Sequence, residues 1–361
     1  MSETTRAPGS TMRALVLSEW GGPLTMQERA LPEPGPGEAL LRVEACGVGY
    51  TLSNIRSGRM AASPGAGLPR VLGNEIVAEV AATGSEVSGV SVGDRVLVHF
   101  YLSCGVCEEC QRGREPLCLA LRGLVGVAVD GGLAEYTVLP ARNLVPFPRH
   151  VAAPLACVVA DAVVTPWHAL RRVAPVGPTD RVVVVGAGGG VGVHALMVAR
   201  LLGATAIGLD LGDAKLAFAR RHGADAVIDG RRDDVPSAVR DVTGGRGATV
   251  VLDYVASDRT LHDAFEYLAP GGVLVIQGVN PPGTELHLEP RRVIQTEATI
   301  TGARYASRRE LVEVAELVAR GAVVPVVTEV VALEQAPELF ERLDRGEVLG
   351  RAAVSFDASG P

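Results

Sequence analysis

The sequence predicts an α/β protein of two domains, one rich in strands and one built on a parallel sheet covered by helices. Three observations lead to this prediction. First, 361 residues exceed what one hydrophobic core usually supports, and a hydrophobic fraction of 47% suffices for two. Second, residues 1–160 carry short apolar runs broken by Gly and Pro. Third, from residue 161 onward apolar runs alternate with helical stretches.

The first domain is predicted over residues 1–160. Its apolar runs are rich in β-branched residues and are separated by turn-forming residues, a pattern typical of short strands joined by irregular loops. The runs read MRALVL, EALLRVEACGVG, EIVAEVAATG, GDRVLVHF and LAEYTVLP.

The second domain is predicted over residues 161–305. Its strands are separated by helical stretches, of which 191–202 and 214–222 are the clearest. Parallel strands need a crossover, usually a helix, so this alternation predicts a sheet of right-handed βαβ units. The predicted strands read RVVVVGAG, TAIGLD, DAVID, ATVVLDYV, GGVLVIQG and ATITGAR.

The last segment, residues 306–361, is predicted to return to the first domain and to make that domain discontinuous. A helix is expected over 308–320. The stretch from 323 to 356 is rich in Val and is predicted to be mainly β-structure.

Charge and composition limit the classes of partner. With 34 basic against 41 acidic residues the net charge is -7, and no basic stripe indicates nucleic acid or an anionic membrane. No secretory leader is evident, and no uninterrupted apolar run reaches the roughly 18 residues of a membrane span. A cytoplasmic protein with a small-molecule partner is therefore predicted. Lys215 is the lone Lys, an Arg bias typical of GC-rich bacterial genomes.

A glycine cluster lies directly between an apolar run and a helical stretch, which is the arrangement that binds a dinucleotide. The glycines let the backbone approach a pyrophosphate, and the helix start offers N–H groups and a favourable dipole. The next predicted strand ends in Asp210, whose carboxylate can hold a ribose 2′-hydroxyl and repels a 2′-phosphate. NAD(H) is therefore favoured over NADP(H). Lys215 is expected either at the ribose or as a solvated lysine. The predicted loop residues are Gly186, Gly188, Gly189 and Gly192.

Four cysteines lie within residues 104–118, with the spacing C-x2-C-x2-C-x7-C. Four thiolates this close suit one tetrahedral zinc and leave no ligand position for a substrate, so one structural Zn²⁺ per chain is predicted. The proposed ligands are Cys104, Cys107, Cys110 and Cys118. The two other cysteines, Cys46 and Cys157, lie in apolar surroundings and are interpreted as buried packing residues.

With these features in this order, the chain resembles the zinc-containing alcohol dehydrogenases of the medium-chain dehydrogenase/reductase family over nearly its whole length. The resemblance implies a GroES-like catalytic domain, a Rossmann domain with a doubly wound parallel sheet, and a homodimer or homotetramer. Besides the cysteines and glycines, it rests on the motifs ACGVGYTLSN, LGNEIVAEVAATG, VGDRVLVHF, ADAVVTPWHAL and GRAAV.

The segment 104–118 with its four cysteines is called the lobe here. Relatives with such a lobe normally hold a second, catalytic zinc through three side chains. The first is a Cys in a G-V-C-H-[ST]-D-like loop, and Gly49 stands there in this chain. The second is the His of a G-H-E motif, replaced by Asn74, and the third matches Asp161. Glycine has no donor atom and Asn is a poor zinc ligand. The sequence therefore predicts that the catalytic zinc is absent.

Other family positions are retained. By the resemblance, Thr51 matches the hydroxyl residue that relays a proton, and Thr165 a residue beside the nicotinamide. Glu75 matches the acid behind the catalytic zinc, and Arg351 a basic residue near the pyrophosphate. Two later relay positions are lost, since they hold Leu52 and Asn54.

Without a Lewis acid, hydride transfer needs an acceptor that is already electrophilic or an acid placed on its oxygen. The predicted function is reduction of an activated C=C or C=N bond in a small organic substrate, such as a secondary metabolite, with Tyr50 or Thr51 as proton donor. Tyr50 can equally be an aromatic residue of the pocket wall. One alternative is a zinc-free alcohol/ketone dehydrogenase using the same two residues. Another is a non-redox enzyme or binding protein that keeps the cofactor structurally.

Three further side chains have a functional and a structural reading. Asp161 can act as a proton donor or steer a cationic iminium, or it can pair with Arg351 or cap the helix that follows. His168 is expected to pack or hydrogen-bond rather than to catalyse. Phe100 and Trp167 are interpreted as pocket or core aromatics.

Overall fold

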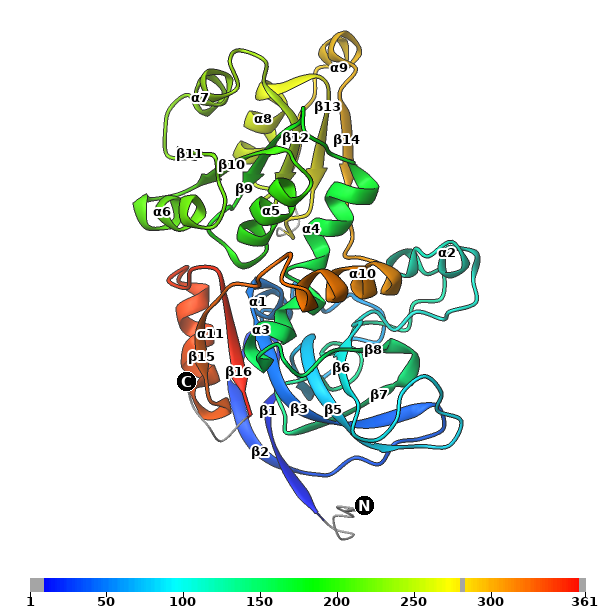
Figure 1. The fold of residues 1–361 in the computed structure, drawn as a ribbon. Coiled ribbons are helices and arrows are strands. Elements are labelled where there is room, and N and C mark those ends of the chain that lie inside the picture. The colour runs from blue at the N-terminus through cyan, green and yellow to red at the C-terminus, as the bar shows by residue number, and fades with distance from the viewer. Residues whose placement is uncertain (1–9, 280–282, 357–361) are drawn as a thin grey trace. The chain divides into compact units, whose positions relative to one another are not determined.

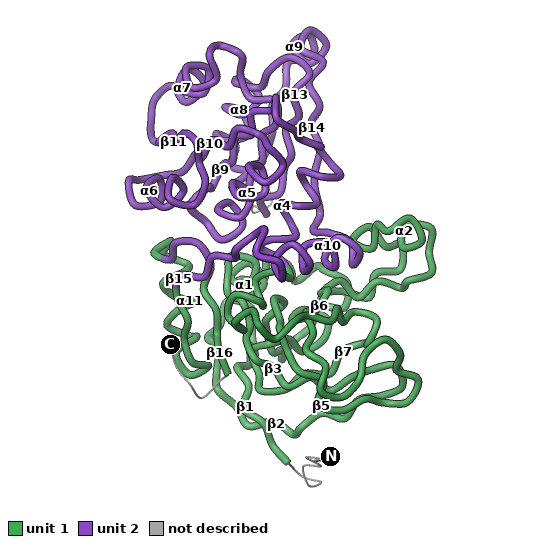
Figure 2. Tube along the Cα trace, viewed as in Figure 1, with its two compact units in different colours: residues 1–160, 329–347, 352–361 green, residues 161–328, 348–351 purple. Residues whose placement is uncertain are grey.

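The protein is described by a computed structural model that covers residues 10–279 and 283–356 (Figure 1). Backbone contacts divide the chain into two compact units (Figure 2). Unit 1 takes residues 1–160, 329–347 and 352–361, and unit 2 takes residues 161–328 and 348–351. The predicted α/β class is confirmed, with one mainly antiparallel unit and one parallel sheet.

Unit 1 is built on two sheets. The smaller has the order β2-β1-β4, and the larger has the order β15-β16-β3-β5-β6-β8 with β7 paired to β3. The strands are β1 (Thr11–Leu17), β2 (Leu24–Ala30), β3 (Glu38–Val48), β4 (Arg70–Val71), β5 (Glu75–Thr83), β6 (Arg95–Val98), β7 (Tyr136–Pro140), β8 (Leu144–Pro146), β15 (Val327–Val331) and β16 (Arg351–Ser355). The helices are α1 (Tyr50–Arg56), α2 (Glu108–Gln111), α3 (Ala153–Cys157) and α11 (Ala336–Asp344).

Strand β3 is the centre of unit 1. It pairs antiparallel with β5, β7 and β16, and most of its residues are buried. A strand buried on both faces reads as a nearly continuous apolar run, as EALLRVEACGVG does. Its end fixes the start of α1, because Gly49 follows β3 directly and is the N-cap residue of that helix.

Unit 2 is a six-stranded parallel sheet in the order β11-β10-β9-β12-β13-β14. Its strands are β9 (Arg181–Val185), β10 (Thr205–Asp210), β11 (Ala226–Asp229), β12 (Ala248–Asp253), β13 (Leu268–Ile276) and β14 (Thr299–Gly302). Its helices are α4 (Val164–His168), α5 (Gly190–Leu201), α6 (Asp213–Arg221), α7 (Val235–Val242), α8 (Asp258–Tyr267), α9 (Pro290–Thr296) and α10 (Arg308–Ala319). Val183, Ile207 and Leu274 belong to its hydrophobic core.

The strand order of unit 2 locates its ligand-binding edge. The chain runs outward from β9 through β10 to β11, then returns to the other side of β9 with β12 and continues to β14. Ligands of such doubly wound sheets bind outside the carboxyl ends of the strands where the order reverses. In this unit that point lies between β9 and β12.

Two features of the last segment differ from the sequence-based prediction. The predicted return to the first domain at residue 306 is too early, because residues 306–328 lie in unit 2. Helix α10 stays there since it packs against α4. The stretch 323–356 is also not all β-structure, since it contains α11, whose buried residues recur at helical spacing and are Ala336, Leu339, Phe340 and Leu343.

One helical stretch, Ala153–Val173, passes a length and composition test for a membrane span. However, 78% of its most apolar window is buried within the protein, and the core helix of a soluble protein passes the same test.

Candidate functional site

The glycine loop between β9 and α5 has the backbone geometry that a dinucleotide needs. Gly186 has a φ of +82°, a conformation that favours glycine, and Gly189 precedes the first turn of α5. A Cβ at Gly192 would lie 2.1 Å from the carbonyl oxygen of Gly186, so the close approach of helix and strand requires glycine. The first N–H groups of a helix have no partner within it and can bind a pyrophosphate. The loop fits a bound dinucleotide.

Asp210 and Lys215 lie beside this loop. Asp210 ends β10 and is buried, and its Oδ2 accepts a hydrogen bond of 2.7 Å from the Gly188 N–H. Its Oδ1 accepts another from the Leu211 N–H at 2.7 Å and lies 3.8 Å from Lys215 Nζ. The structure therefore brings Gly188, Asp210 and Lys215 together. A carboxylate has further lone pairs, so Asp210 can still accept a ribose hydroxyl.

Arg351 also lies against the glycine loop within unit 2. The Gly350 N–H donates to the Gly188 carbonyl at 2.9 Å. A Cβ at Gly190 would lie 2.6 Å from Arg351 Cδ, so this side chain packs directly over the start of α5. Arg351 is buried and places a positive charge beside the predicted pyrophosphate position.

Asp161 forms a cluster with Thr165 and Arg351. The Thr165 hydroxyl donates to Asp161 Oδ1 at 2.7 Å, and the Thr165 N–H donates to the Asp161 carbonyl at 2.9 Å. Arg351 Nη2 lies 3.6 Å from Asp161 Oδ2. The pairing of Asp161 with Arg351 therefore has a geometric basis, whereas the capping of the following helix does not, because the N-cap residue of α4 is Val163 and no side chain caps that helix.

His194 is a residue of the cofactor helix that sequence reasoning did not select. It is fully buried on α5, with Nδ1 2.6 Å from the Gly190 carbonyl oxygen. Its Nε2 accepts the Val326 N–H at 2.9 Å, so Nδ1 carries the proton and donates to Gly190. Burial lowers the pKa of His194 to about 4, and the nearby charges of Arg351 and His222 act in the same direction. The sequence feature that could have identified His194 is its position four residues after a glycine at the start of a helix.

Acidification is expected to destabilise unit 2 through His194. In the unfolded chain, His194 takes up a proton below its ordinary pKa near 6.5, whereas in the folded chain it stays neutral down to about pH 4. The free energy of unfolding therefore falls as the pH drops through this window, and its full value is present above the window. The loss amounts to about 3 kcal/mol. His194→Gln keeps an amide donor and acceptor without titrating. Denaturant unfolding at pH 7.5 and 4.5 should show a smaller pH effect in this variant.

The matched control for this prediction is His287→Gln, because the His287 side chain is 84% exposed. It should keep the pH dependence of the wild type. Equal pH dependence in His194→Gln and the wild type would contradict the assignment.

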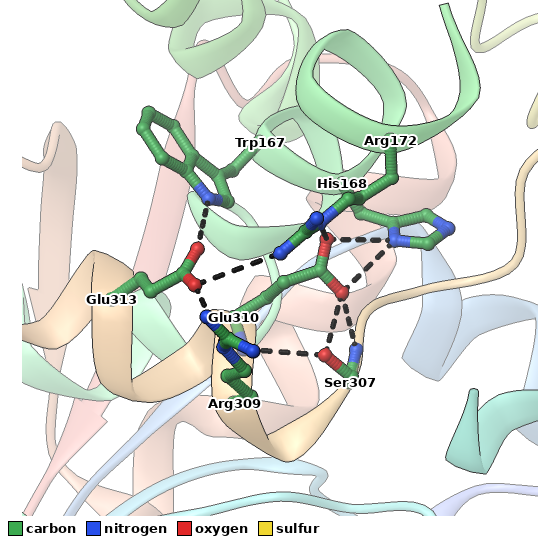
Figure 3. Close-up of polar contacts among 7 residues, drawn as sticks. All are labelled: Trp167, His168, Arg172, Ser307, Arg309, Glu310 and Glu313. Atoms are coloured by element: carbon green, nitrogen blue, oxygen red, sulfur yellow. Dashed lines mark hydrogen bonds and ion pairs between the residues drawn. The ribbon is translucent and has the colours of Figure 1, made fainter. Parts of the chain in front are cut away.

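His168 takes part in an ion-pair cluster between α4 and α10 (Figure 3). Its Nδ1 lies 2.9 Å from Glu310 Oε1, and Glu310 Oε2 accepts from the Ser307 hydroxyl at 2.7 Å. Burial alone would raise the pKa of Glu310, but these hydrogen bonds lower it below its usual value. The indole N–H of Trp167 donates to Glu313 at 3.3 Å. These contacts support a structural role for His168 and Trp167.

In unit 1, Tyr50 and Thr51 begin α1. Tyr50 is 53% exposed, and its hydroxyl lies 4.0 Å from the position of a Cβ at Gly346. Partial burial and then the charge of Asp344 raise the pKa of Tyr50, while Arg59 lowers it. The raised pKa makes Tyr50 a weaker proton donor than an ordinary tyrosine. Thr51 is half-buried.

In unit 1, the side chains at the two substituted relay positions are either buried or hydrogen-bonded to a neighbouring side chain. Leu52 is buried, and Asn54 Oδ1 accepts from Arg59 Nη1 at 2.9 Å.

The Gly73–Glu75 segment of unit 1 is buried against the end of β3. Asn74 and Glu75 are 2% and 1% exposed. A Cβ at Gly47 would lie 2.0 Å from Glu75 Oε2, so the carboxylate lies directly over that glycine. Cys46 Sγ lies 2.7 Å from the position of a Cβ at Gly73.

The two isolated cysteines are both buried, as predicted. Cys157 Sγ donates to the Pro154 carbonyl at 3.3 Å.

The four lobe cysteines form a cluster that fits one tetrahedral zinc. All four sulfurs lie within 4.8 Å of one another, with Cys107 to Cys110 at 3.5 Å and both Cys104 to Cys110 and Cys107 to Cys118 at 3.9 Å. A Zn–S length of about 2.3 Å gives tetrahedral S–S distances of about 3.8 Å. Backbone N–H groups lower the pKa of Cys107 to about 6, whereas burial and the neighbouring thiols raise the pKa of Cys110 to about 12, so the case for zinc rests on the sulfur geometry.

Over residues 10–279 and 283–356, no second group of three or more His, Cys, Asp or Glu side chains is gathered closely enough to hold a metal.

Comparison with known proteins identifies relatives over the whole chain. The family described as "Alcohol dehydrogenase GroES-like domain" matches residues 35–149, and "Zinc-binding dehydrogenase" matches residues 190–320. An NAD-dependent alcohol dehydrogenase of Saccharolobus solfataricus is 34% identical over 95% of this chain and 99% of its own length.

Two solved structures are similar throughout. The crystal structure of AibC is 35% identical with a TM-score of 0.88, covering 96% of each chain. The crystal structure of an NAD-dependent alcohol dehydrogenase is 34% identical with a TM-score of 0.89, covering 96% of this chain and 100% of the other.

Proposed function

The chain belongs to the zinc-type alcohol dehydrogenases of the medium-chain dehydrogenase/reductase family, and from this premise we propose that it reduces an activated C=C or C=N bond without a catalytic zinc. It is an NAD(P)-dependent oxidoreductase of that family and acts on a small molecule. What we propose beyond this is the chemical class of the hydride acceptor and the absence of a catalytic zinc ion.

The observation that carries the proposal is the set of side chains at the three ligand positions of the catalytic zinc. Gly49 offers only backbone and caps α1, and Asn74 offers an amide. Asp161 shares its carboxylate between Thr165 and Arg351, so a metal would compete with a guanidinium. One carboxylate with two non-ligands does not fit zinc, whereas the four cysteines do.

In this proposal the chain's own residues bind the cofactor, and they orient and protonate the substrate. The bound cofactor supplies a hydride. The glycine loop and Arg351 hold its pyrophosphate, and Asp210 holds its adenosine ribose. Since no Lewis acid activates the acceptor, its own conjugation or positive charge must make it electrophilic. Thr51 and Tyr50 are the proposed proton donors of unit 1: by family resemblance Thr51 would relay a proton, and the raised pKa of Tyr50 makes its hydroxyl a weaker acid than that of an ordinary tyrosine.

Product analysis tests this proposal. The enzyme as isolated is supplied with NADH and 2-cyclohexen-1-one, a cyclic imine such as 2-methyl-1-pyrroline, or cyclohexanone. Oxidation of NADH with the enone or the imine, giving the saturated ketone or the amine, is the expected result. Deuteride from labelled NADH should appear on the β-carbon of the enone. Turnover confined to cyclohexanone, or 1,2-reduction of the enone, would contradict the proposal.

A second candidate is a zinc-free alcohol/ketone dehydrogenase, favoured by the alcohol dehydrogenase names of the relatives. The same assay separates the two, because this candidate predicts turnover of cyclohexanone. The non-redox alternative finds no support among relatives that are named as dehydrogenases.

We further propose NAD(H) over NADP(H), because Asp210 places a buried carboxylate where a 2′-phosphate would approach. Asp210→Ser removes this charge and is expected to raise the NADPH affinity relative to NADH by roughly 100-fold. Titration of nicotinamide fluorescence measures both dissociation constants. The control is Asp213→Asn, whose side chain is fully exposed and which should leave the ratio unchanged. Equal affinity of the wild type for both cofactors would contradict the proposal.

The family relationship and the net charge of -7 support a cytoplasmic homodimer or homotetramer without a nucleic-acid or membrane partner. Light scattering coupled to size exclusion tests the assembly.

A further inference from the structure

The carboxyl ends of β12 and β13 place two polar side chains next to each other in unit 2. Strands β12 and β13 lie side by side and pair in parallel (Figure 1). Asp253 lies opposite Ile276, and the next residues are Tyr254 and Gln277. The Gln277 N–H donates to the Asp253 carbonyl at 2.9 Å, which holds the two chain segments together. In a doubly wound sheet, this edge faces the bound ligand.

Tyr254 also adjoins the glycine loop. Its N–H donates to the carbonyl of Val185, the last residue of β9, at 3.3 Å. Its Cβ lies 3.7 Å from the position of a Cβ at Gly186. The side chain therefore starts at the point where the strand order reverses.

The polar tips of these two side chains are buried without a hydrogen-bond partner in the described part of the chain. This holds for Tyr254 Oη and for both amide atoms of Gln277. An unpaired buried polar group destabilises the folded state, so native proteins seldom keep one without a use. Three such atoms at a ligand-binding edge indicate that a bound molecule supplies their partners.

We propose that the Tyr254 hydroxyl donates a hydrogen bond to the carbonyl oxygen of the substrate, taking over the task that zinc performs in other family members, and that Gln277 positions the nicotinamide carboxamide beside it. The proposal rests on the proposed function and adds a catalytic residue to it. An amide side chain presents both a donor and an acceptor, which complements a carboxamide.

The surroundings of Tyr254 suit a donor that keeps its proton. Burial first, and then the negative charge of Asp161, raise the pKa of Tyr254 far above its usual value. The geometric placement of Tyr254 comes from the sheet, where Asp253 pairs with Val185 and the Tyr254 Cβ lies beside Gly186 at the cofactor edge. By family resemblance, Asp161 stands at a ligand position of the catalytic zinc.

The proposed reaction of a conjugated ketone begins with hydride transfer. A hydride, supplied by the bound NADH, adds to the β-carbon, and the electron pair of the C=C bond shifts to form an enolate. Tyr254 stabilises the oxygen through its O–H without losing the proton. A proton then adds to the α-carbon from Thr51 or Tyr50, the proposed donors, which regain it from solvent. The sum is enone, NADH and H⁺ giving saturated ketone and NAD⁺.

Tyr254→Phe tests this role in the full-length enzyme. Removal of one oxyanion donor is expected to lower kcat by roughly 100-fold with 2-cyclohexen-1-one. The dissociation constant of NADH, from nicotinamide fluorescence, should change less than about threefold, because this hydroxyl serves the substrate. Binding of cyclohexanone to the enzyme–NAD⁺ complex, measured by calorimetry, should weaken by roughly fivefold, the value of one neutral hydrogen bond.

Two further variants complete the test. Gln277→Leu should weaken NADH binding by roughly tenfold with a smaller effect on kcat. Tyr267→Phe, which removes a hydroxyl from a core tyrosine of the same unit, should match the wild type.

Three results would overturn the assignment of Tyr254: a kcat within threefold of the wild type, an equal loss of kcat and NADH affinity, or unchanged cyclohexanone binding. The wild type alone decides the proposed function, through its products and its metal content. If it reduces cyclohexanone instead of the enone, that function fails, and Tyr254→Phe still tests the hydrogen bond on the ketone.

Discussion

Cys107→Ser is expected to abolish zinc binding and to unfold the lobe of residues 104–118 locally. Three of the sulfur–sulfur distances in the cluster already lie near tetrahedral values, and Cys107 takes part in two of them. The lobe has little core of its own, since α2 has no buried residue and Val106 is 74% exposed. Structural zinc sites contribute on the order of 10 kcal/mol to the folding of such segments.

Zinc per chain, measured by elemental analysis, should fall from one to nearly zero in Cys107→Ser. Limited proteolysis should then cut within 104–118 while the sheets of both units persist. Cys157→Ser removes a buried thiol outside the cluster and is expected to keep the zinc and the protease resistance. A Cys107→Ser variant with a full zinc content and an intact lobe would contradict the assignment.

Gly192→Ala is expected to have the second large effect, on both stability and cofactor binding. The added Cβ would lie 2.1 Å from the Gly186 carbonyl oxygen and 2.9 Å from Ala187 Cα, which are backbone atoms that cannot move aside like a side chain. The start of α5 must therefore shift away from β9. Overpacking of this kind typically costs about 3 kcal/mol of unfolding free energy. The NADH dissociation constant is expected to rise by roughly 100-fold, because the N–H groups at the helix start are displaced.

Gly189→Ala is the matched control in the same loop. Its φ of -83° suits any residue, and its Cβ would lie 3.3 Å from the Gly186 carbonyl oxygen, a tight but tolerable contact. Denaturant unfolding should show only a small loss of stability for this variant, which is a control for stability alone because Gly189 is itself a predicted residue of the cofactor loop. Equal effects of the two substitutions would show that close helix–strand packing is not what the loop requires.

The parts of the fold that depend on local backbone chemistry could be predicted from the sequence. A glycine cluster after an apolar strand specifies both a turn and a close approach, and the structure has Gly186 and Gly192 in those roles. Four cysteines within 15 residues of sequence lie close together in space when the segment folds into one lobe. Helix α11 could also have been predicted from the sequence, because its buried positions follow the helical period.

Features that depend on long-range packing could not be predicted. The placement of α10 in unit 2 follows from its contact with α4 through His168 and Glu310, which are 142 residues apart in the sequence. The partners of Asp161 include Arg351, which sequence patterns can propose but not position. That the polar tips of Tyr254 and Gln277 have no hydrogen-bond partner within residues 10–279 and 283–356 can be found only from the folded structure.

The central claim is that no metal ion serves the reacting end of the cofactor site. Anomalous scattering at the zinc absorption edge, from crystals of the NADH-bound enzyme, tests it most directly. We expect one peak per chain, enclosed by Cys104, Cys107, Cys110 and Cys118. A second peak coordinated by Asp161 would contradict the account and identify an enzyme that uses a catalytic metal.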